Sequence, residues 1–204
     1  MRISELSRRS GVSVATLKFY LREGMLPRGH VTSRTQAEYD DEHLARVRVI
    51  GALSAVPGLP LARIRTILEL LDEPGEDLQH SMGKAVDELP PYVEPADDHP
   101  RARATIEHLG LTYHPDFAAV GQLEAAIDAI EAAGMRWDTD TMERYGEAML
   151  AVARGEIATL TDGSLDQDPI TYAVLGTALH EPVLLALRRL AHLHLLVQGD
   201  AAQA

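Results

Sequence analysis

Residues 13–27 of the chain read SVATLKFYLREGMLP, a pattern that predicts the second helix of a helix-turn-helix. Ser13 is a favourable N-cap because its hydroxyl can accept a hydrogen bond from a free amide of the first turn, and Gly11 permits a tight turn from a preceding helix. Leu17 and Leu21 are four residues apart and therefore share one buried face. The remaining side of the helix stays free to face a groove of DNA.

The stretches on either side of this helix predict the rest of a small domain. A short helix is expected from Ser4, as its cap, to about Ser10. Residues 28–36 are rich in Gly, Thr, Ser and Arg, which favours a β-hairpin or wing over core structure. Two further helices are expected, one opening at residues 39–41, where acidic side chains suit the positive end of a helix, and one over residues 60–71. The packed side of the third helix is expected at Leu44, Val47, Ile50 or Gly51, and Ser54.

Charge is divided unevenly along the chain, whose 204 residues carry a net charge of −12. Residues 1–71 contain 11 Lys and Arg against 7 Asp and Glu, a net charge of +4, and residues 72–204 contain 8 against 24, a net charge of −16. Because phosphates attract the first segment and repel the second, this division predicts a DNA-binding head and an acidic body held off the duplex. A merely solvated acidic surface is the simpler explanation for the body.

The composition excludes several classes of protein and site. The absence of cysteine excludes disulfides and thiolate sites, and agrees with a reducing compartment. No apolar run approaches the about 18 residues that span a bilayer, and residues 1–5 lack the apolar segment of a signal peptide. A soluble cytoplasmic protein without membrane contact is therefore expected.

Residues 1–72 as a whole resemble the MerR family of transcription regulators. The motifs that carry the resemblance, in order, are ISELSRRSGVS (3–13), TLKFY (16–20), GMLP (24–27), Tyr39 with Leu44, and GLPL (58–61) with Ile64. The resemblance implies a winged helix-turn-helix that binds double-stranded DNA. It also implies a homodimer on a pseudo-palindromic operator, and control of transcription by distorting promoter DNA at which RNA polymerase is a partner.

Three positions depart from the pattern of the family. Ala15 stands where relatives often carry Arg, Phe19 where they carry Tyr, and Ala37 where the wing usually has an arginine. Arg34 or Arg28 can reach the phosphates that the wing arginine would contact. The operator sequence is therefore not transferable from relatives.

The expected DNA contacts follow from where a recognition helix lies. Its N-terminal residues lie deepest in the major groove and meet base edges, whereas tyrosines and arginines around it fix phosphates. Phe19 and Tyr20 have a second interpretation, as core residues. The predicted DNA-binding residues are Ser13, Val14, Ala15, Thr16, Lys18, Phe19, Tyr20, Arg22, Arg28, Arg34 and Tyr39.

The remainder of the chain predicts an all-α half. Residues 73–100 suggest a short helix, at 77–89, and a linker rich in proline and acids, and they lack the sustained apolar heptads of a dimerising coiled coil. Helices are expected over 117–133, 139–160 and 169–197, the last either kinked or divided by Pro182 and buried both against its own bundle and against a second subunit. We thus expect three parts, 1–72, 73–100 and 101–204, in a mainly α fold with a small β wing. The third part is loosely similar to TetR-type ligand-binding bundles, by analogy alone.

Aromatic and thioether side chains in this half suggest a pocket for a small organic effector, since such side chains adapt to apolar ligands. An ordinary helical core explains the same residues. The predicted effector-binding residues are Tyr113, Phe117, Trp137, Met142, Tyr145, Met149 and Tyr172. No cofactor or hydrolase motif is present, and the spacing of His192 and His194 disfavours a shared metal, so neither an enzyme nor a metal site is expected. A protein-interaction or anti-repressor module that docks through the acidic half is the alternative function.

Overall fold

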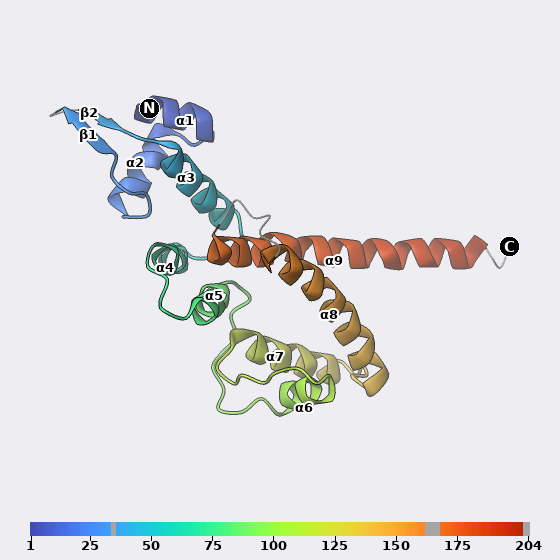
Figure 1. Cartoon of the computed structure of the whole chain (residues 1–204). Coiled ribbons are helices and arrows are strands. Elements are labelled where there is room, and N and C mark those ends of the chain that lie inside the picture. Colours follow the sequence, from blue (N-terminus) through green and yellow to red (C-terminus); the bar gives the residue numbers. More distant parts are fainter. Residues whose placement is uncertain (34–35, 162–167, 202–204) are drawn as a thin grey trace. The chain divides into compact units, whose positions relative to one another are not determined.

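The computed structural model describes residues 1–33, 36–161 and 168–201. In this part of the chain the elements are helical apart from one hairpin, as expected (Figure 1). The chain divides into two compact units, Met1–Pro74 with Ala173–Ala204, and Gly75–Tyr172. The elements are α1 (Ile3–Ser10), α2 (Val14–Arg22), β1 (His30–Ser33), β2 (Gln36–Glu38), α3 (Asp41–Ser54), α4 (Leu61–Asp72), α5 (Leu78–Asp87), α6 (Pro100–His108), α7 (Ala118–Ala132), α8 (Thr139–Thr161) and α9 (Pro169–Ala201).

The first two helices form the predicted helix-turn-helix. Gly11 ends α1 in the left-handed region, at φ 73°, where a side chain would be strained, and its amide returns to the Ser7 carbonyl oxygen. Ser13 caps α2 as predicted. The prediction that Ser4 caps α1 is wrong, because the N-cap is Arg2, two residues earlier, and it makes no side-chain hydrogen bond.

The predicted wing is a two-stranded antiparallel hairpin. His30 pairs with Glu38 and Val31 with Ala37, and the register then shifts by the time Ser33 pairs with Gln36. Gly29 precedes the hairpin at a point of close approach, since a Cβ there would lie 2.7 Å from the Glu38 carbonyl oxygen. Any side chain at this position would therefore push the base of the wing apart.

Helices α3 and α4 complete the core of the head. Leu44, Val47 and Ile50 are buried as predicted. The prediction for Ser54 is wrong, because that side is closed by Leu53, which is fully buried, while Ser54 is exposed. The large, almost fully buried side chains of the head come from all four helices and the segment after α2: Leu6, Leu17, Met25, Leu26, Val47, Ile50, Leu53, Ile67 and Leu68.

Arg46 in α3 joins three segments of the head. Its Nε donates to the Met25 carbonyl oxygen at 2.9 Å, and its Nη2 donates to the Leu68 carbonyl oxygen at 3.3 Å and to Asp72 at 2.6 Å. These bonds fix the chain just after α2 against the end of α4. The position of α2 thus depends on a side chain outside the helix-turn-helix.

The second unit is built around α6 and α7. Ala102, Ile106 and Val120 form its buried cluster, with Tyr113 and Leu123 packed against it. The α6 helix was not predicted. Residues 90–100, expected to be a linker, belong to this unit and contact its helices: Gln122 Nε2 donates to the Pro91 carbonyl oxygen at 2.8 Å, and His99 is buried.

One close contact joins α8 to the end of α6. A Cβ on Gly146 would lie 2.5 Å from a methyl carbon of Leu109. The branched side chain of Leu109 therefore occupies the space that any side chain at 146 would need.

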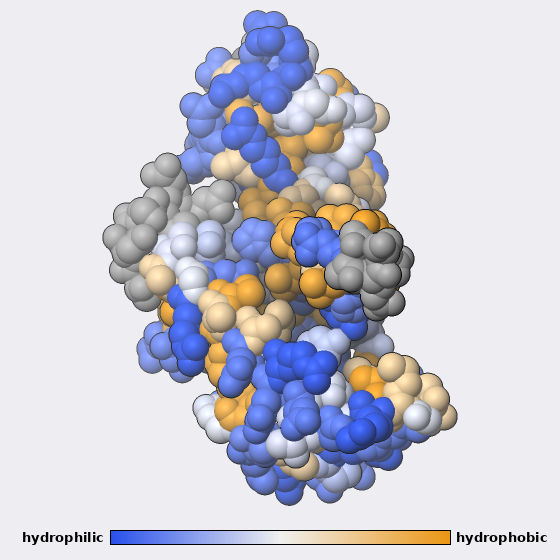
Figure 2. All heavy atoms as spheres, turned by 90° about the vertical axis from the view of Figure 1, so that its right-hand side faces the viewer, coloured by the Kyte–Doolittle hydropathy of each residue, from blue (hydrophilic) through white to orange (hydrophobic). Residues whose placement is uncertain are grey.

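The last helix, α9, runs unbroken from Pro169 to Ala201, so Pro182 does not divide it. Ile170, Val174 and Ala178 near its start are buried, but the leucines and valines from Leu179 to Val197 are exposed, apart from the half-buried Leu184. The expectation that this helix is buried against its own bundle is thus wrong beyond residue 178. In Figure 2, where the C-terminal end of α9 faces the viewer, hydrophobic residues gather around it.

The expectation about apolar runs also needs correction. Residues Pro169–Gln198 form one helix that is long and apolar enough to cross a membrane by length and composition, with a mean hydropathy of 1.4. Such a single helix is weak support for a membrane span, because core and interface helices have the same composition.

Candidate DNA-binding site

The start of α2 is held by hydrogen bonds from the turn before it. Ser13 Oγ accepts from the Thr16 backbone N–H at 3.1 Å and lies 2.8 Å from Thr16 Oγ1. Ser7 Oγ donates to the Val12 carbonyl oxygen at 2.6 Å and so ties α1 to the turn. These contacts orient the first turn of α2, the part of a recognition helix that meets base edges.

The two sides of α2 differ in burial. Leu17 is fully buried and Tyr20 is 8% exposed, so this side packs into the head. Ala15 and Lys18 are exposed on the other side. Lys18 makes no ion pair within the part of the chain that the structure describes, so its ammonium is not neutralised by a neighbouring carboxylate. The predicted residues Val14, Thr16 and Phe19 are partly exposed.

Arginines extend the positive surface beyond α2. Arg22 is largely exposed, stacks 5.5 Å from the centre of the Phe19 ring and lies 3.7 Å from Glu23. Arg28 is exposed just before the wing. Arg34, also predicted to contact DNA, lies outside the described residues. The charged side chains that are placed thus lie on α2 and on the segment that follows it.

Two predicted phosphate ligands are buried instead. Tyr20 and Tyr39 are 8% and 7% exposed, and burial raises the pKa of the Tyr39 hydroxyl. Their rings therefore belong to the core of the head, the second interpretation that the sequence allowed for Tyr20. A phosphate contact through either hydroxyl stays a prediction.

Sequence reasoning missed a polar cluster at the base of the wing. Asp40 Oδ1 accepts from the His43 backbone N–H at 3.1 Å, and His43 Nδ1 accepts from the Asp40 backbone N–H at 3.3 Å, so the two residues form a capping box at the start of α3. His43 Nδ1 also lies 2.6 Å from Asp40 Oδ1. The hydrogen bond from the His43 side chain, together with the backbone bond, holds the pKa of the Asp40 carboxyl well below its usual value. The acid at N-cap and the residue three positions later are the signal that could have predicted this contact.

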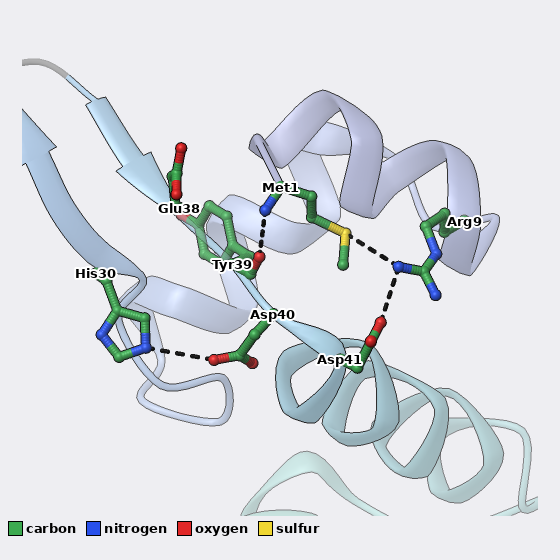
Figure 3. Close-up of a pocket in the computed structure, with 7 residues that line it drawn as sticks. All are labelled: Met1, Arg9, His30, Glu38, Tyr39, Asp40 and Asp41. Carbon is green, nitrogen blue, oxygen red and sulfur yellow. Dashed lines mark hydrogen bonds and ion pairs between the residues drawn. The ribbon is translucent and has the colours of Figure 1, made fainter.

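A cavity of about 440 Å³ opens beside this cluster and is lined by Met1, Arg9, His30, Glu38, Tyr39, Asp40 and Asp41 (Figure 3). Arg9 pairs with Asp41 at 2.8 Å, and His30 lies 3.3 Å from Asp40. Three carboxylates line the cavity, whereas Arg9 is paired with one of them and the Met1 ammonium donates to the Tyr39 carbonyl oxygen, so the cavity itself does not suit a phosphate.

The predicted effector residues are not gathered in one place. Trp137 stacks on Tyr145 with ring centres 6.0 Å apart and donates to Thr105 Oγ1 at 3.0 Å. Tyr113 packs against the α6–α7 cluster under Arg103. Met149 is 46% exposed. Met142 and Tyr172 are partly exposed on α8 and α9.

Among the predicted effector residues, Phe117 lines a cavity of about 520 Å³ between α5 and the segment before α7. Its other lining residues are mostly of charged or polar type, and Asp87 among them accepts from the Ala118 backbone N–H at 3.0 Å while burial raises its pKa. Sequence reasoning did not find these polar residues because they carry no motif. They include Asp77, His80, Lys84, Asp87 and His114.

The comparisons with known proteins agree with this geometry. The family model of the MerR HTH family regulatory protein matches residues 1–71. No curated protein matches the chain. Among solved structures, the crystal structure of SCO5550 from Streptomyces coelicolor A3(2), a proposed transcriptional regulator, is similar, with 33% sequence identity over 95% of each chain and a TM-score of 0.72.

The alignment with SCO5550 extends over almost the whole length of both chains, and the family model covers the head that contains α2. The chain is a DNA-binding transcription regulator and belongs to the MerR family.

Proposed function

We propose that the chain acts as a homodimer that binds a pseudo-palindromic operator in promoter DNA, distorts that DNA for RNA polymerase, and responds to a small organic effector. The DNA-binding part of this proposal rests on one observation, the difference in burial between the two sides of α2. Leu17 anchors the helix in the head, while Ala15 and Lys18 remain exposed. Lys18 can donate to guanine, and Ala15 can contact a thymine methyl.

The order of the capping residue and the exposed arginines along the head supports binding of α2 in the major groove. The cap at Ser13 fixes the helix start, and Arg22 and Arg28 follow at its far end and in the next segment. Base readout by the first turns and phosphate contacts by the following arginines is the usual arrangement in helix-turn-helix complexes. The wing between Gly29 and Glu38 then lies next to the same phosphates.

An effector fits best in the cavity beside Phe117. Its volume lies in the range of small-molecule sites, and it combines one aromatic wall with charged side chains that can orient a ligand. A ligand shifts the regulator only if it binds two arrangements of the dimer unequally, and a change in the spacing of the two heads alters the distortion forced on DNA.

The DNA-binding claim is tested by fluorescence anisotropy with duplexes from the region upstream of the chain's own gene. We expect saturable binding of two chains to one duplex, and none to a duplex of shuffled sequence. A double variant, Lys18→Ala with Arg28→Ala, should lose this binding and keep its fold by circular dichroism. If the double variant bound as well as the wild type, α2 would not be the reading element.

The effector claim has a separate test. A compound screen by thermal unfolding should yield ligands that raise the Tm of the wild type. Phe117→Ala should abolish that rise, whereas Met135→Ala, at an exposed site away from the cavity, should not. A rise that survives Phe117→Ala would place the effector elsewhere.

The alternative, a module that docks on another protein through the acidic half, is distinguished by the same double variant. A docking protein would retain its partner after Lys18 and Arg28 are replaced, because neither side chain belongs to the acidic half.

A further inference from the structure

The exposed part of α9 carries a regular apolar stripe. Apolar residues recur at alternating intervals of three and four positions, the heptad spacing of helices that pair with another helix. At 100° per residue, they fall within roughly 80° of arc on the helix surface from Leu179 to Val197. The stripe consists of Gly176, Leu179, Val183, Ala186, Leu190, Leu193 and Val197.

The side chains of this stripe are open to solvent in the single chain. Leu179 is 47% exposed, and Leu190 and Leu193 are 59% and 58% exposed. Large contiguous apolar surfaces of this kind mark interaction sites in soluble proteins. The buried residues Ile170 and Val174, by contrast, lie on the first turns of the same helix.

We propose that a second copy of this chain covers the stripe, so that α9 is the dimerisation helix. The proposal rests on the homodimer proposed above and names the surface that forms it. The short α5 helix that follows the head, Leu78–Asp87, has ten residues and no such repeat. Helix α9 has 33 residues and carries three heptads of the stripe.

The size of the exposed surface is sufficient for a pair of helices. Seven large side chains lie on the stripe or flank it: Leu179, Val183, Leu187, Leu190, Leu193, Leu196 and Val197. At about 80 Å² for each, two copies would bury roughly 1,100 Å² in all. This value exceeds the about 1,000 Å² expected of a specific interface.

The positions of the charges favour a partner helix over a lipid bilayer. Glu181, Arg188 and His192 lie on the side of α9 opposite the stripe, and Arg189 lies beside it. A paired helix leaves that side in water. A bilayer would instead surround Arg188 and Arg189 near the middle of the apolar segment, where charged side chains are costly.

The test compares two matched variants of the full chain by sedimentation equilibrium. Leu190→Glu with Leu193→Glu places two charges on the stripe. Leu185→Glu with Leu195→Glu places the same charges at equally exposed sites off the stripe, where the leucines are 56% and 65% exposed. We expect the first pair to raise the dimer dissociation constant by at least about 100-fold, and the second pair to leave the protein dimeric.

Disulfide trapping gives a second readout that does not depend on destabilising the dimer. The chain has no cysteine, so single cysteines can be introduced at Val183, Ala186, Leu190 and Leu193. At least one should form an intermolecular disulfide on mild oxidation, while Leu185→Cys should not. Trapping at every position would show parallel helices, and trapping at one would show antiparallel helices.

Several outcomes would overturn the proposal. Stripe variants that remain dimeric and still bind the operator would show that another surface forms the dimer, while the proposed function would stand. A wild-type chain that is monomeric yet binds one operator would refute the homodimer itself. Sedimentation of the wild type with phosphatidylcholine vesicles would assign the stripe to a membrane.

Discussion

Lys18 is an exposed basic side chain on the proposed recognition helix, and its removal should lower the affinity for the operator directly. A side chain that reads one base contributes about 1–3 kcal/mol, and the proposed dimer carries two copies of Lys18, so Lys18→Ala is expected to weaken operator binding by at least about 30-fold. Arg144→Ala removes the same charge from α8 and should leave the affinity unchanged. Anisotropy titrations at one salt concentration compare the two, and equal losses would show that only net charge matters.

The Ser13 hydroxyl should stabilise the head by capping α2. Because its Oγ accepts the Thr16 amide at 3.1 Å, Ser13→Ala should lower the free energy of unfolding by about 1 kcal/mol. Ser13→Asn supplies another cap and should restore most of that loss. Urea titrations measure both variants, and an Asn variant as weak as the Ala variant would argue against capping.

The lowered pKa of Asp40 makes the stability of the head depend on pH. A carboxylate whose pKa is lowered by folding stabilises the protein above its unfolded pKa, and this contribution is lost as the pH falls through the folded pKa. Asp40→Asn should therefore be less stable than the wild type at pH 7, with a difference that shrinks below about pH 4. Urea titrations at stepped pH measure this difference, which would stay constant if the charge of Asp40 were irrelevant.

Residues with local partners were the ones that sequence could predict. Ser13 caps the helix that it begins, and Leu17 follows from a repeat within that helix. The burial of the Tyr39 ring, by contrast, comes from packing that no local pattern encodes, and its predicted phosphate contact stays a prediction. The polar residues around Phe117 were missed for the same reason, since they come from segments about 30 residues apart.

Among the elements, α3 depends on Arg46 for its connection to the rest of the head. The side chain is only 13% exposed and makes three hydrogen bonds. Arg46→Ala should lower the free energy of unfolding by about 2–3 kcal/mol, because it leaves carbonyl groups and Asp72 without their donor. Arg48→Ala, on the exposed side of α3, should change it by less than about 0.5 kcal/mol. Thermal unfolding separates the two, and equal effects would refute the role of Arg46.

Elements with strong repeats or caps were predicted, whereas one without them was missed. Residues 100–108 contain few apolar side chains, and α6 is stabilised instead by contacts with α7: Glu124 accepts the Ala102 backbone N–H at 2.8 Å and pairs with Arg101. That acceptor lies 22 residues away, so the helix start had no visible cap in sequence. Helix α9 shows the converse error, because its apolar repeat correctly predicted a helix, whereas the predicted burial against its own bundle is wrong beyond residue 178.

For the molecule as a whole, the division of charge between a head of +4 and a body of −16 predicts the response to salt. A dimer that neutralises six to ten phosphates should lose about 10³- to 10⁵-fold in operator affinity between about 50 and 200 mM salt. Anisotropy titrations across that range measure the slope. A flat dependence would show that phosphates contribute little, and would favour the docking alternative.

The division of charge was visible in sequence, but the division into units was only partly so. The end of the head was expected near residue 72, and Met1–Pro74 does group together. That Ala173–Ala204 belongs to the same unit follows from tertiary contacts that no linear pattern records. The three-part domain assignment itself stays a prediction.

The packing of Leu109 over Gly146 also predicts how residue size at these two positions should vary among homologues. Because a Cβ at 146 would lie 2.5 Å from a Leu109 methyl, the two sites share one volume. Homologous chains with alanine or a larger residue at the position of Gly146 should carry a smaller residue at that of Leu109. The two alignment columns should therefore covary, and a lineage that gained bulk at one site alone would need another rotamer at position 109 or a shifted α8.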